Sequence, residues 1–202
     1  MRDNFWDELM GSDDDAMFYM QSYGEGVGSD TRHTLSAFIN EGETLLDAGC
    51  GPGWNYEHFL EYGPILGAYK GTDYSARMIR GCKAKYPEAD FEVQDARDLK
   101  EPDNSWDVVL LQDIVEHTNG YEKPIESALR VARKRVIVTF WHLTENDDHI
   151  NDDGNDGYGA WYSKPKLENY LDSLGYMWIH THSQPDDNRE HDFYVIDKEE
   201  PK

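Results

Sequence analysis

The chain has few cysteines and no long apolar run. Its 202 residues include two cysteines, Cys50 and Cys82, whose spacing matches neither a metal motif nor a disulfide framework. No stretch reaches the roughly 18 apolar residues of a membrane span, and the N-terminus lacks the apolar core of a signal peptide. We therefore expect a cytoplasmic protein that does not bind a membrane.

Positive charge is also scarce. Nineteen Lys and Arg residues stand against 41 Asp and Glu residues, so the formal net charge is −22. Because nucleic-acid binding draws its affinity from clustered Lys and Arg, we expect no nucleic-acid partner for this acidic protein. The acidity fits either a field that attracts a cationic small-molecule substrate or the solvated surface of a protein from a saline environment.

What the sequence does contain is a regular alternation of strand-like and helix-like segments. The predicted strands are 43–48, 67–73, 90–94, 106–111, 135–141, 177–181 and 193–196. The predicted helices are 29–40, one from about residue 55, 75–85, 125–133 and 163–174. Such alternation predicts parallel strands with right-handed crossovers, and the last two strands, with no helix between them, predict an antiparallel edge hairpin.

We accordingly expect one α/β domain over residues 1–202, with a doubly wound, seven-stranded, mostly parallel sheet. Both faces of such a sheet are covered, which accounts for the nearly continuous apolar runs of its strands. Residues 1–28 form an N-terminal lead-in, rich in aromatic and acidic residues, that could cover a ligand site.

A glycine-rich turn, residues 47–53, follows the first predicted strand with the sequence DAGCGPG. In a doubly wound sheet, ligands bind beyond the carboxyl ends of the strands. Trp54 replaces the last glycine of a G-x-G-x-x-G dinucleotide fingerprint, and the absence of lysine excludes a P-loop. Asp73 and Asp95 end the next two strands, so carboxylates gather at the predicted ligand edge.

In this order, the segments resemble the class I S-adenosylmethionine-dependent methyltransferases, in the branch that acts on small molecules. The resemblance covers roughly residues 35–197. It rests on residues 45–53, 71–75 with Met78, 93–96, 106–111, 115–117 and 162–176. It implies a Rossmann-like fold and S-adenosylmethionine as the methyl donor.

The resemblance also implies which residues contact the cofactor. These are Asp47, Ala48, Gly49, Cys50, Gly51, Asp73 and Gln112 for the amino-acid tail, sulfonium and ribose, and Tyr74, Met78, Asp95 and Ala96 for the adenine. Asp47 would balance the ammonium group or anchor the turn. Asp73 would accept both ribose hydroxyls, an arrangement that favours a free diol. Asp95 would accept from the exocyclic amine of adenine.

His117, just after the fourth predicted strand, is the candidate general base, because imidazole titrates near neutral pH. The alternative is a histidine at a helix start that makes a structural hydrogen bond. The stretch Asp113-x-x-Glu116-His117 also resembles the metal-binding segment of small-RNA 3′-end methyltransferases, with Asp113 where that family has Glu. Metal-free relatives carry the same Glu-His pair, and the net charge is unsuited to RNA, so we expect no metal.

Residues 141–162 form a long connection after the fifth predicted strand, where this family places substrate contacts. We predict Trp141, His142, Tyr158 and Trp161 as substrate residues. They fit either a lid over an aromatic, acidic pocket for an amine, or a polar surface loop whose aromatics pack locally.

The predicted function is methyl transfer to a nitrogen or oxygen atom of a small molecule. Two alternatives stay open. One is an aminopropyl transferase that uses decarboxylated S-adenosylmethionine, which would make use of the acidity. The other is a non-catalytic partner subunit that binds the cofactor.

Overall fold

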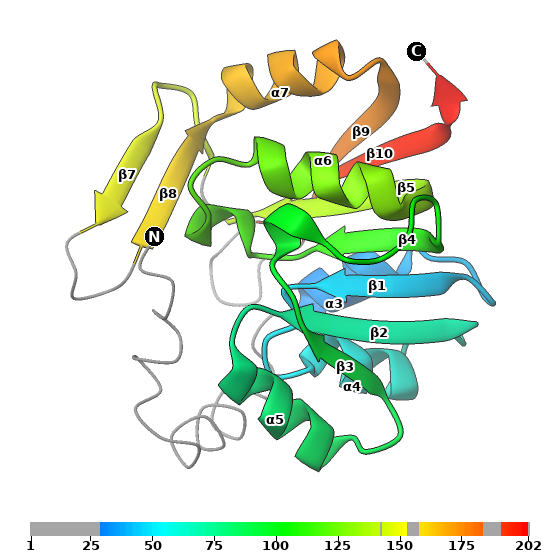
Figure 1. Ribbon diagram of the computed structural model, residues 1–202. Helices are drawn as coiled ribbons and strands as arrows, with labels where there is room; N and C mark the ends of the chain where they lie inside the picture. The colour runs from blue at the N-terminus through cyan, green and yellow to red at the C-terminus, as the bar shows by residue number, and fades with distance from the viewer. Residues whose placement is uncertain (1–28, 142, 153–157, 184–190, 202) are drawn as a thin grey trace.

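A computed structural model describes residues 29–141, 143–152, 158–183 and 191–201, so the lead-in 1–28 lies outside the described residues. Its largest element is a seven-stranded sheet of order β3-β2-β1-β4-β5-β10-β9 (Figure 1). The strands are β1 Thr44–Ala48, β2 Ala68–Asp73, β3 Asp90–Val93, β4 Trp106–Leu111, β5 Ala132–Phe140, β9 Tyr176–His182 and β10 Asp192–Pro201. The first five are parallel, and β10 is antiparallel to both of its neighbours. The predicted fold class, edge hairpin included, is confirmed.

Helices cover both faces of this sheet. They are α3 Ser29–Ser36, α4 Trp54–Glu61, α5 Ala76–Lys85, α6 Glu122–Val131 and α7 Lys164–Ser173, with short 3-10 turns η1 Ala96–Asp98 and η2 Val115–His117. Leu45 and Leu46 show why both faces need cover: successive strand residues point to opposite faces, and both side chains are fully buried. Leu45 belongs to a core cluster with residues of α3 and α4, and Leu46 belongs to one with residues of α6 and α7.

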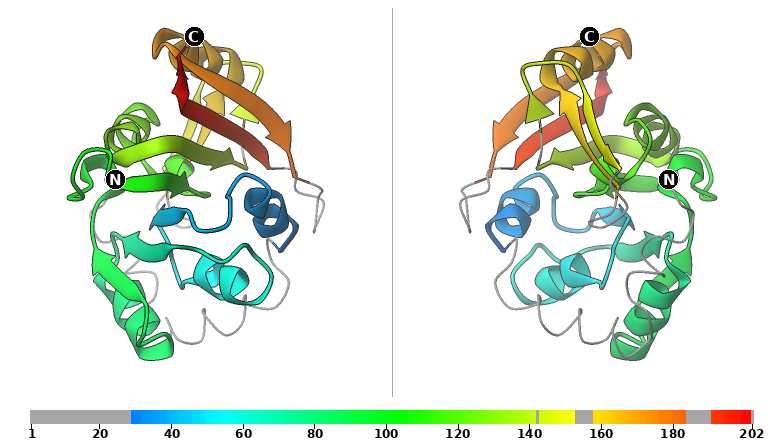
Figure 2. Two further views of the ribbon diagram at one scale, coloured as in Figure 1. Left: turned by 90° about the vertical axis from the view of Figure 1, so that its right-hand side faces the viewer. Right: turned by 90° about the vertical axis from the view of Figure 1, so that its left-hand side faces the viewer.

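The sheet is strongly twisted. Seen from the side, the orange and red strands β9 and β10 run steeply across the direction of the green strand β4 (Figure 2). This is the right-handed twist expected of L-amino-acid strands. Among the described residues, no helix is both long enough and apolar enough to cross a membrane.

The long connection after β5 contains strands that the sequence did not predict. β6 Leu143–Thr144, β7 His149–Asp152 and β8 Tyr158–Ser163 form a second sheet of order β6-β8-β7. These strands are short, and most described residues of 143–150 are exposed, so the segment lacks the apolar runs that reveal a buried strand. The Tyr162 hydroxyl anchors this sheet, donating to Thr118 O (2.8 Å) and accepting from Gly120 N (3.1 Å).

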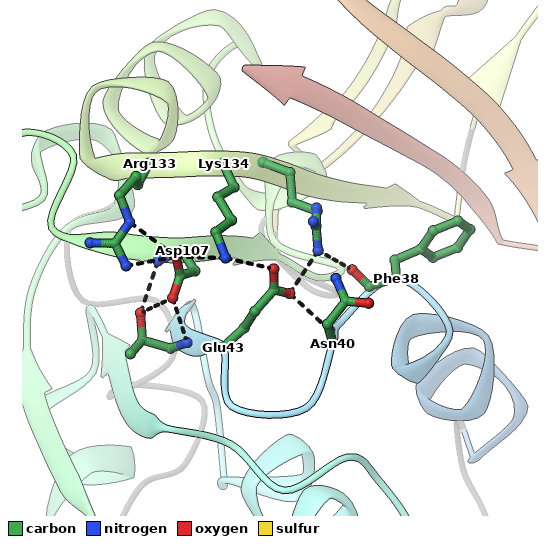
Figure 3. A network of polar contacts seen from close by, with 8 residues as sticks. Phe38, Asn40, Glu43, Asp107, Arg133 and Lys134 are labelled. Atoms are coloured by element: carbon green, nitrogen blue, oxygen red, sulfur yellow. Dashed lines mark hydrogen bonds and ion pairs between the residues drawn. The ribbon is translucent and has the colours of Figure 1, made fainter. Parts of the chain in front are cut away.

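Several predicted boundaries are wrong: the helix expected over 29–40 ends at Ser36, and the strand expected over 135–141 spans Ala132–Phe140. The helix expected over 125–133 spans Glu122–Val131, and Arg133 lies in β5. In β5 the Arg133 guanidinium pairs with Asp107 of β4 at 2.6 Å (Figure 3). Burial alone would raise the pKa of Asp107, but the hydrogen bonds from Arg133, Thr44 and Lys134 outweigh it and hold the pKa at about 2.

The same polar network includes Glu43, which pairs with Lys134 at 3.2 Å and with Arg135 at 2.7 Å (Figure 3). It ties together the amino ends of β1, β4 and β5. The opposite rim, where the parallel strands end, is thereby left for the ligand site.

Candidate active site

The glycine turn after β1 is closed on one side and open on the other. The backbone N–H groups of Gly49 and Cys50 both donate to Thr72 O, at 2.7 and 2.8 Å. Gly49 has φ +94°, and a Cβ there would lie 2.2 Å from Ile114 Cγ2. A Cβ on Gly51 would meet nothing within 4 Å. The turn therefore packs tightly on the chain that follows β4 and leaves its Gly51 side accessible.

Asp73 ends β2 directly beside this turn. Its carboxylate accepts from Gly51 N at 2.9 Å and from Ser75 N at 2.8 Å. One carboxylate thus joins the carboxyl end of β2 to the glycine turn of β1. The structure brings together two segments that the sequence separates by more than twenty residues, as the predicted ribose site requires.

Asp47, the last acidic residue of β1, is fully buried. Its Oδ2 accepts from the Tyr69 hydroxyl at 2.7 Å and from Asn55 Nδ2 at 3.1 Å. Its Oδ1 is buried and accepts no hydrogen bond from the described residues. Burial raises the pKa of Asp47 to about 6, the bonds from Tyr69 and Asn55 act against it, and the charge of Asp73 adds to it.

Asp95 follows β3 and begins the η1 turn. It accepts from Arg97 N at 2.9 Å and forms a two-pronged ion pair with the Arg97 guanidinium, the shorter contact being 2.6 Å. Burial opposes ionisation, but the Arg97 bonds prevail and hold the pKa of Asp95 below its ordinary value. Asp95 is therefore an ionised carboxylate at the predicted edge, engaged by a neighbouring arginine.

The turn after β4 carries a second set of polar side chains. Asp113 has φ +54°, a left-handed conformation that is uncommon outside glycine and often marks a functional site. Thr139 of β5 holds it: Asp113 N donates to Thr139 Oγ1 (3.0 Å), and that hydroxyl donates to Asp113 Oδ1 (2.6 Å). His191, just before β10, places Nε2 3.7 Å from Asp113 Oδ2.

Glu116 and His117 lie in the adjoining η2 turn. Glu116 is fully buried and accepts from Trp141 N at 2.7 Å. Burial, with the nearby charge of Asp113, raises the pKa of Glu116 well above its ordinary value. The His117 ring lies 5.7 Å from the Trp141 ring. An imidazole, a carboxylate and a buried acid therefore gather beside the glycine turn, with Ile114 as the point of contact.

Residues 46–140, which contain the turn and all of these carboxylates, match the family model of the methyltransferase domain. This match supports the class I S-adenosylmethionine-dependent methyltransferases, the family that the sequence motifs resemble. S-adenosylmethionine is the cofactor of this family of enzymes.

Known methyltransferases resemble the chain in sequence and in fold. The demethylmenaquinone methyltransferase of Renibacterium salmoninarum is 31% identical over 106 residues, 51% of this chain and 44% of the relative. A chain in the complex between the Haloferax volcanii Trm112 methyltransferase activator and a methyltransferase matches with TM-score 0.72 at 16% identity, covering 92% of this chain and 96% of that one. Magnesium protoporphyrin IX methyltransferase of Synechocystis, solved with S-adenosylmethionine, matches with TM-score 0.70 at 18% identity over 97% of both chains. The match thus spans less than half of the curated relative, and the two structures show a shared fold.

The residues of this site fit the cofactor on two observations. Asp47 Oδ1 and Gln112 Oε1 are buried acceptors that receive no hydrogen bond from the described residues, so donors of a bound ligand would complete them. The absence of a Cβ at Gly51 leaves room for close approach to the backbone. Asp47, Asp73, Gln112 and the turn residues Ala48, Gly49, Cys50 and Gly51 are the groups that would hold the tail and ribose.

The predicted adenine residues are arranged less uniformly. Met78 is 3% exposed and Tyr74 is 43% exposed, so only Tyr74 presents its ring to solvent. Ala96 is partly buried against the larger core cluster. Asp95 would have to share its carboxylate between Arg97 and the exocyclic amine. These four remain predicted adenine contacts.

Two of the four predicted substrate residues, Trp141 and Trp161, make described ring contacts, each with a different partner. Trp141 lies by η2, whereas Trp161 packs its ring 5.5 Å from His149 in the small sheet. Tyr158 begins β8, and His142 lies outside the described residues. Tyr162, from the same connection, is core: its ring packs against Tyr121 at 5.0 Å.

Sequence reasoning missed Thr139, His191 and Thr31 as members of the site. Thr31 is buried on α3, and its hydroxyl lies 3.0 Å from His191 Nδ1. His191 follows a polar loop nearly 80 residues after Asp113, and no local pattern links the two. Asp113 could have been found from the sequence, because the Asp113-x-x-Glu116-His117 stretch resembles a metal-binding segment of other methyltransferases.

We predict that Asp47→Asn changes how stability depends on pH. Because the folded pKa of about 6 lies above the ordinary 3.8, the stability that Asp47 contributes is present below pH 3.8 and is lost as the pH rises to about 6. Asp47→Asn removes this loss. The free energy of unfolding of the variant should therefore rise relative to that of the wild type by roughly 3 kcal/mol across that pH window. Urea unfolding at several pH values measures it.

Asp98→Asn, at an exposed acid on η1, is the matched control and should not reproduce the gain of Asp47→Asn. Parallel wild-type and Asp47→Asn curves between about pH 4 and 6.5 would show that Asp47 titrates normally.

Proposed function

We propose that this protein transfers the methyl group of S-adenosylmethionine to a nitrogen or oxygen atom of a small molecule. The observation that carries the proposal is the Asp73 carboxylate, 2.9 Å from Gly51 N at the accessible side of the glycine turn. A small-molecule acceptor is supported by the name of the Renibacterium relative, a demethylmenaquinone methyltransferase.

When bound, S-adenosylmethionine supplies a methyl group on a sulfonium. The sulfur leaves as a neutral thioether, so no acid is needed. The protein therefore has to position two reactants, a source of rate that can supply roughly 7–11 kcal/mol. Asp73 and the turn would hold the donor. The η2 side would hold the acceptor, because Ile114 keeps it in contact with Gly49.

The η2 side of the site carries groups that could take a proton from an N–H or O–H nucleophile. Asp113 Oδ2 accepts a hydrogen bond from Gln112 Nε2 at 3.4 Å and lies 3.7 Å from His191 Nε2, and the Asp113 side chain is 33% exposed. His191 lies beside this carboxylate and His117 lies in the adjoining η2 turn, and an imidazole can take up a proton. The carboxylates would also attract an acceptor with positive charge, which agrees with the net charge of −22.

Two measurements test the proposal on the full chain. Calorimetry with S-adenosylmethionine, its decarboxylated form and NAD should show binding of the first and much weaker binding of the others. Radiolabelled methyl transfer to a panel of amines, alcohols and quinols should then identify acceptors. Preference for the decarboxylated form would favour aminopropyl transfer instead, and binding without transfer to any compound would contradict a small-molecule enzyme.

His117→Gln should lower the turnover number by ~10²-fold with little change in cofactor affinity, if the imidazole takes the acceptor proton. His33→Gln, at an exposed histidine on α3, is the control and should leave turnover unchanged. An unaltered rate for His117→Gln at saturating acceptor would assign His117 to the alternative role of a structural histidine.

A second candidate is a methyltransferase that works with a protein activator. It is favoured by the likeness, over 92% of this chain, to a chain of the complex that contains the Haloferax Trm112 activator. Edge strand β9 also exposes two apolar side chains, Met177 and Ile179. The test is whether transfer by the pure chain rises when a Trm112-type protein is added; an unchanged rate counts against an activator.

A further inference from the structure

A second cluster of ligand-type side chains lies on the edge hairpin. His180 and His182 alternate along β9, so both side chains point to the same face. The register of β10 places Asp192 opposite His182 and Tyr194 opposite His180. The ligand atoms of His180, His182 and Asp192 all lie within 4.8 Å of one another.

The three ligand atoms lie close together, and the shortest pair, His180 Nε2 and Asp192 Oδ1, is a hydrogen bond that a metal ion would replace. Asp192 Oδ1 is 2.6 Å from His180 Nε2 and 3.3 Å from His182 Nδ1, and the two rings are 4.5 Å apart at 77°. A tetrahedral zinc ion with bonds of about 2.0–2.2 Å holds its donor atoms roughly 3.4 Å apart. Small side-chain rotations would bring all three donors onto one ion.

The surroundings hold one ligand firmly and leave another accessible. The His180 ring stacks on the buried Tyr194 ring at 4.6 Å and 22°, and the Tyr194 hydroxyl donates to Glu168 Oε1 at 3.1 Å. The side chains of His180 and Asp192 are 18% exposed, and that of His182 is 46% exposed. An ion could therefore enter from solvent at His182 and find His180 already oriented.

We propose that His180, His182 and Asp192 bind a divalent d-block cation, Zn²⁺ being the best match. Two imidazole nitrogens and one carboxylate suit zinc, nickel, cobalt or copper, whereas Mg²⁺ and Ca²⁺ prefer all-oxygen sites. Three protein ligands leave a coordination position for water. The ion joins β9 to β10 where the two strands approach the rim of the active site, one residue from His191.

The test uses the full chain without a histidine tag, treated with EDTA and dialysed. Calorimetry should show one Zn²⁺ per chain, and Co²⁺ should give the visible absorption of a cobalt site with nitrogen ligands. Saturating Zn²⁺, about 100-fold above Kd, should raise Tm by about 5 °C, while Mg²⁺ and Ca²⁺ should not. Failure of the wild type to bind Zn²⁺ in a 1:1 ratio would overturn the proposal.

His182→Gln is the decisive variant, because that side chain is the most exposed of the three and its loss leaves the fold intact. It should weaken Zn²⁺ binding by at least ~10-fold and abolish the Tm shift. His149→Gln, at an exposed histidine of β7, should bind Zn²⁺ like the wild type. Equal affinity of His182→Gln and wild type would also overturn the proposal. Cofactor binding, measured in parallel, should be unchanged, so this result is independent of the methyl-transfer proposal.

Discussion

Gly49→Ala should abolish cofactor binding and lower the free energy of unfolding by roughly 2–4 kcal/mol. Two physical costs add. The φ of +94° disfavours any residue with a Cβ, and the new Cβ would lie 2.2 Å from Ile114 Cγ2 and 3.1 Å from Ile114 Cβ. Relief requires the turn and the chain around Ile114 to separate, which would displace Asp113 and η2 from the donor side. Calorimetry and urea unfolding measure the two effects.

Gly175→Ala is a matched control for this prediction. Gly175 also has a positive φ, +78°, but a Cβ there would meet nothing within 4 Å. Gly175→Ala should lower the free energy of unfolding by only about 1 kcal/mol, the cost of the unfavourable backbone conformation, and should leave cofactor affinity unchanged. Adding Ile114→Ala to Gly49→Ala should restore part of the lost stability, because it removes the clashing methyl group. Normal binding by Gly49→Ala would show that the contact with Ile114 yields easily.

Asp73→Asn should weaken S-adenosylmethionine binding by ~10–100-fold. Asparagine keeps one acceptor for Gly51 N or Ser75 N but loses the charge, and a hydrogen bond to a charged group is worth about 1.5–3 kcal/mol. The fold should survive, since β2 stays paired with β1 and β3. Calorimetry with S-adenosylhomocysteine, which shares the ribose, should show the same loss.

Asp98→Asn serves as the control here too, because it removes one acidic charge without touching the glycine turn. Its cofactor affinity should equal that of the wild type. If both variants bind equally well, Asp73 acts only as a structural cap for residues 51 and 75, and the ribose must be held elsewhere.

Much of the predicted cofactor site, the glycine turn and the carboxylates beside it, could be predicted from local sequence. The apolar runs of β1 and β4 identify strands buried on both faces, and the glycine register at 49, 51 and 53 marks the turn that follows. Once the strands are parallel, their carboxyl ends share one rim, so Asp47, Asp73 and Asp95 had to lie along it. The contact between Asp73 and Gly51 N follows from that topology.

Contacts between distant segments could not be read in this way. The local ion pair of Asp95 with Arg97 was not predicted either, and Asp95 remains a predicted adenine contact. Arg133 was predicted to be helical, but it lies in β5, which pairs with β4, and it contacts Asp107 there. The strands β6, β7 and β8 carry no apolar alternation, and packing of Tyr162 on η2 anchors them instead.

The amino-acid sequence by itself thus determined the parallel sheet, the glycine turn and the row of carboxylates at its rim, because each depends on periodicity or on residues close along the chain. Tertiary structure alone decided that His191 and Thr139 join Asp113, and that two histidines of β9 meet Asp192. Those groupings depend on which strands become neighbours and in which register, and strand pairing is a property of the folded chain rather than of any local segment.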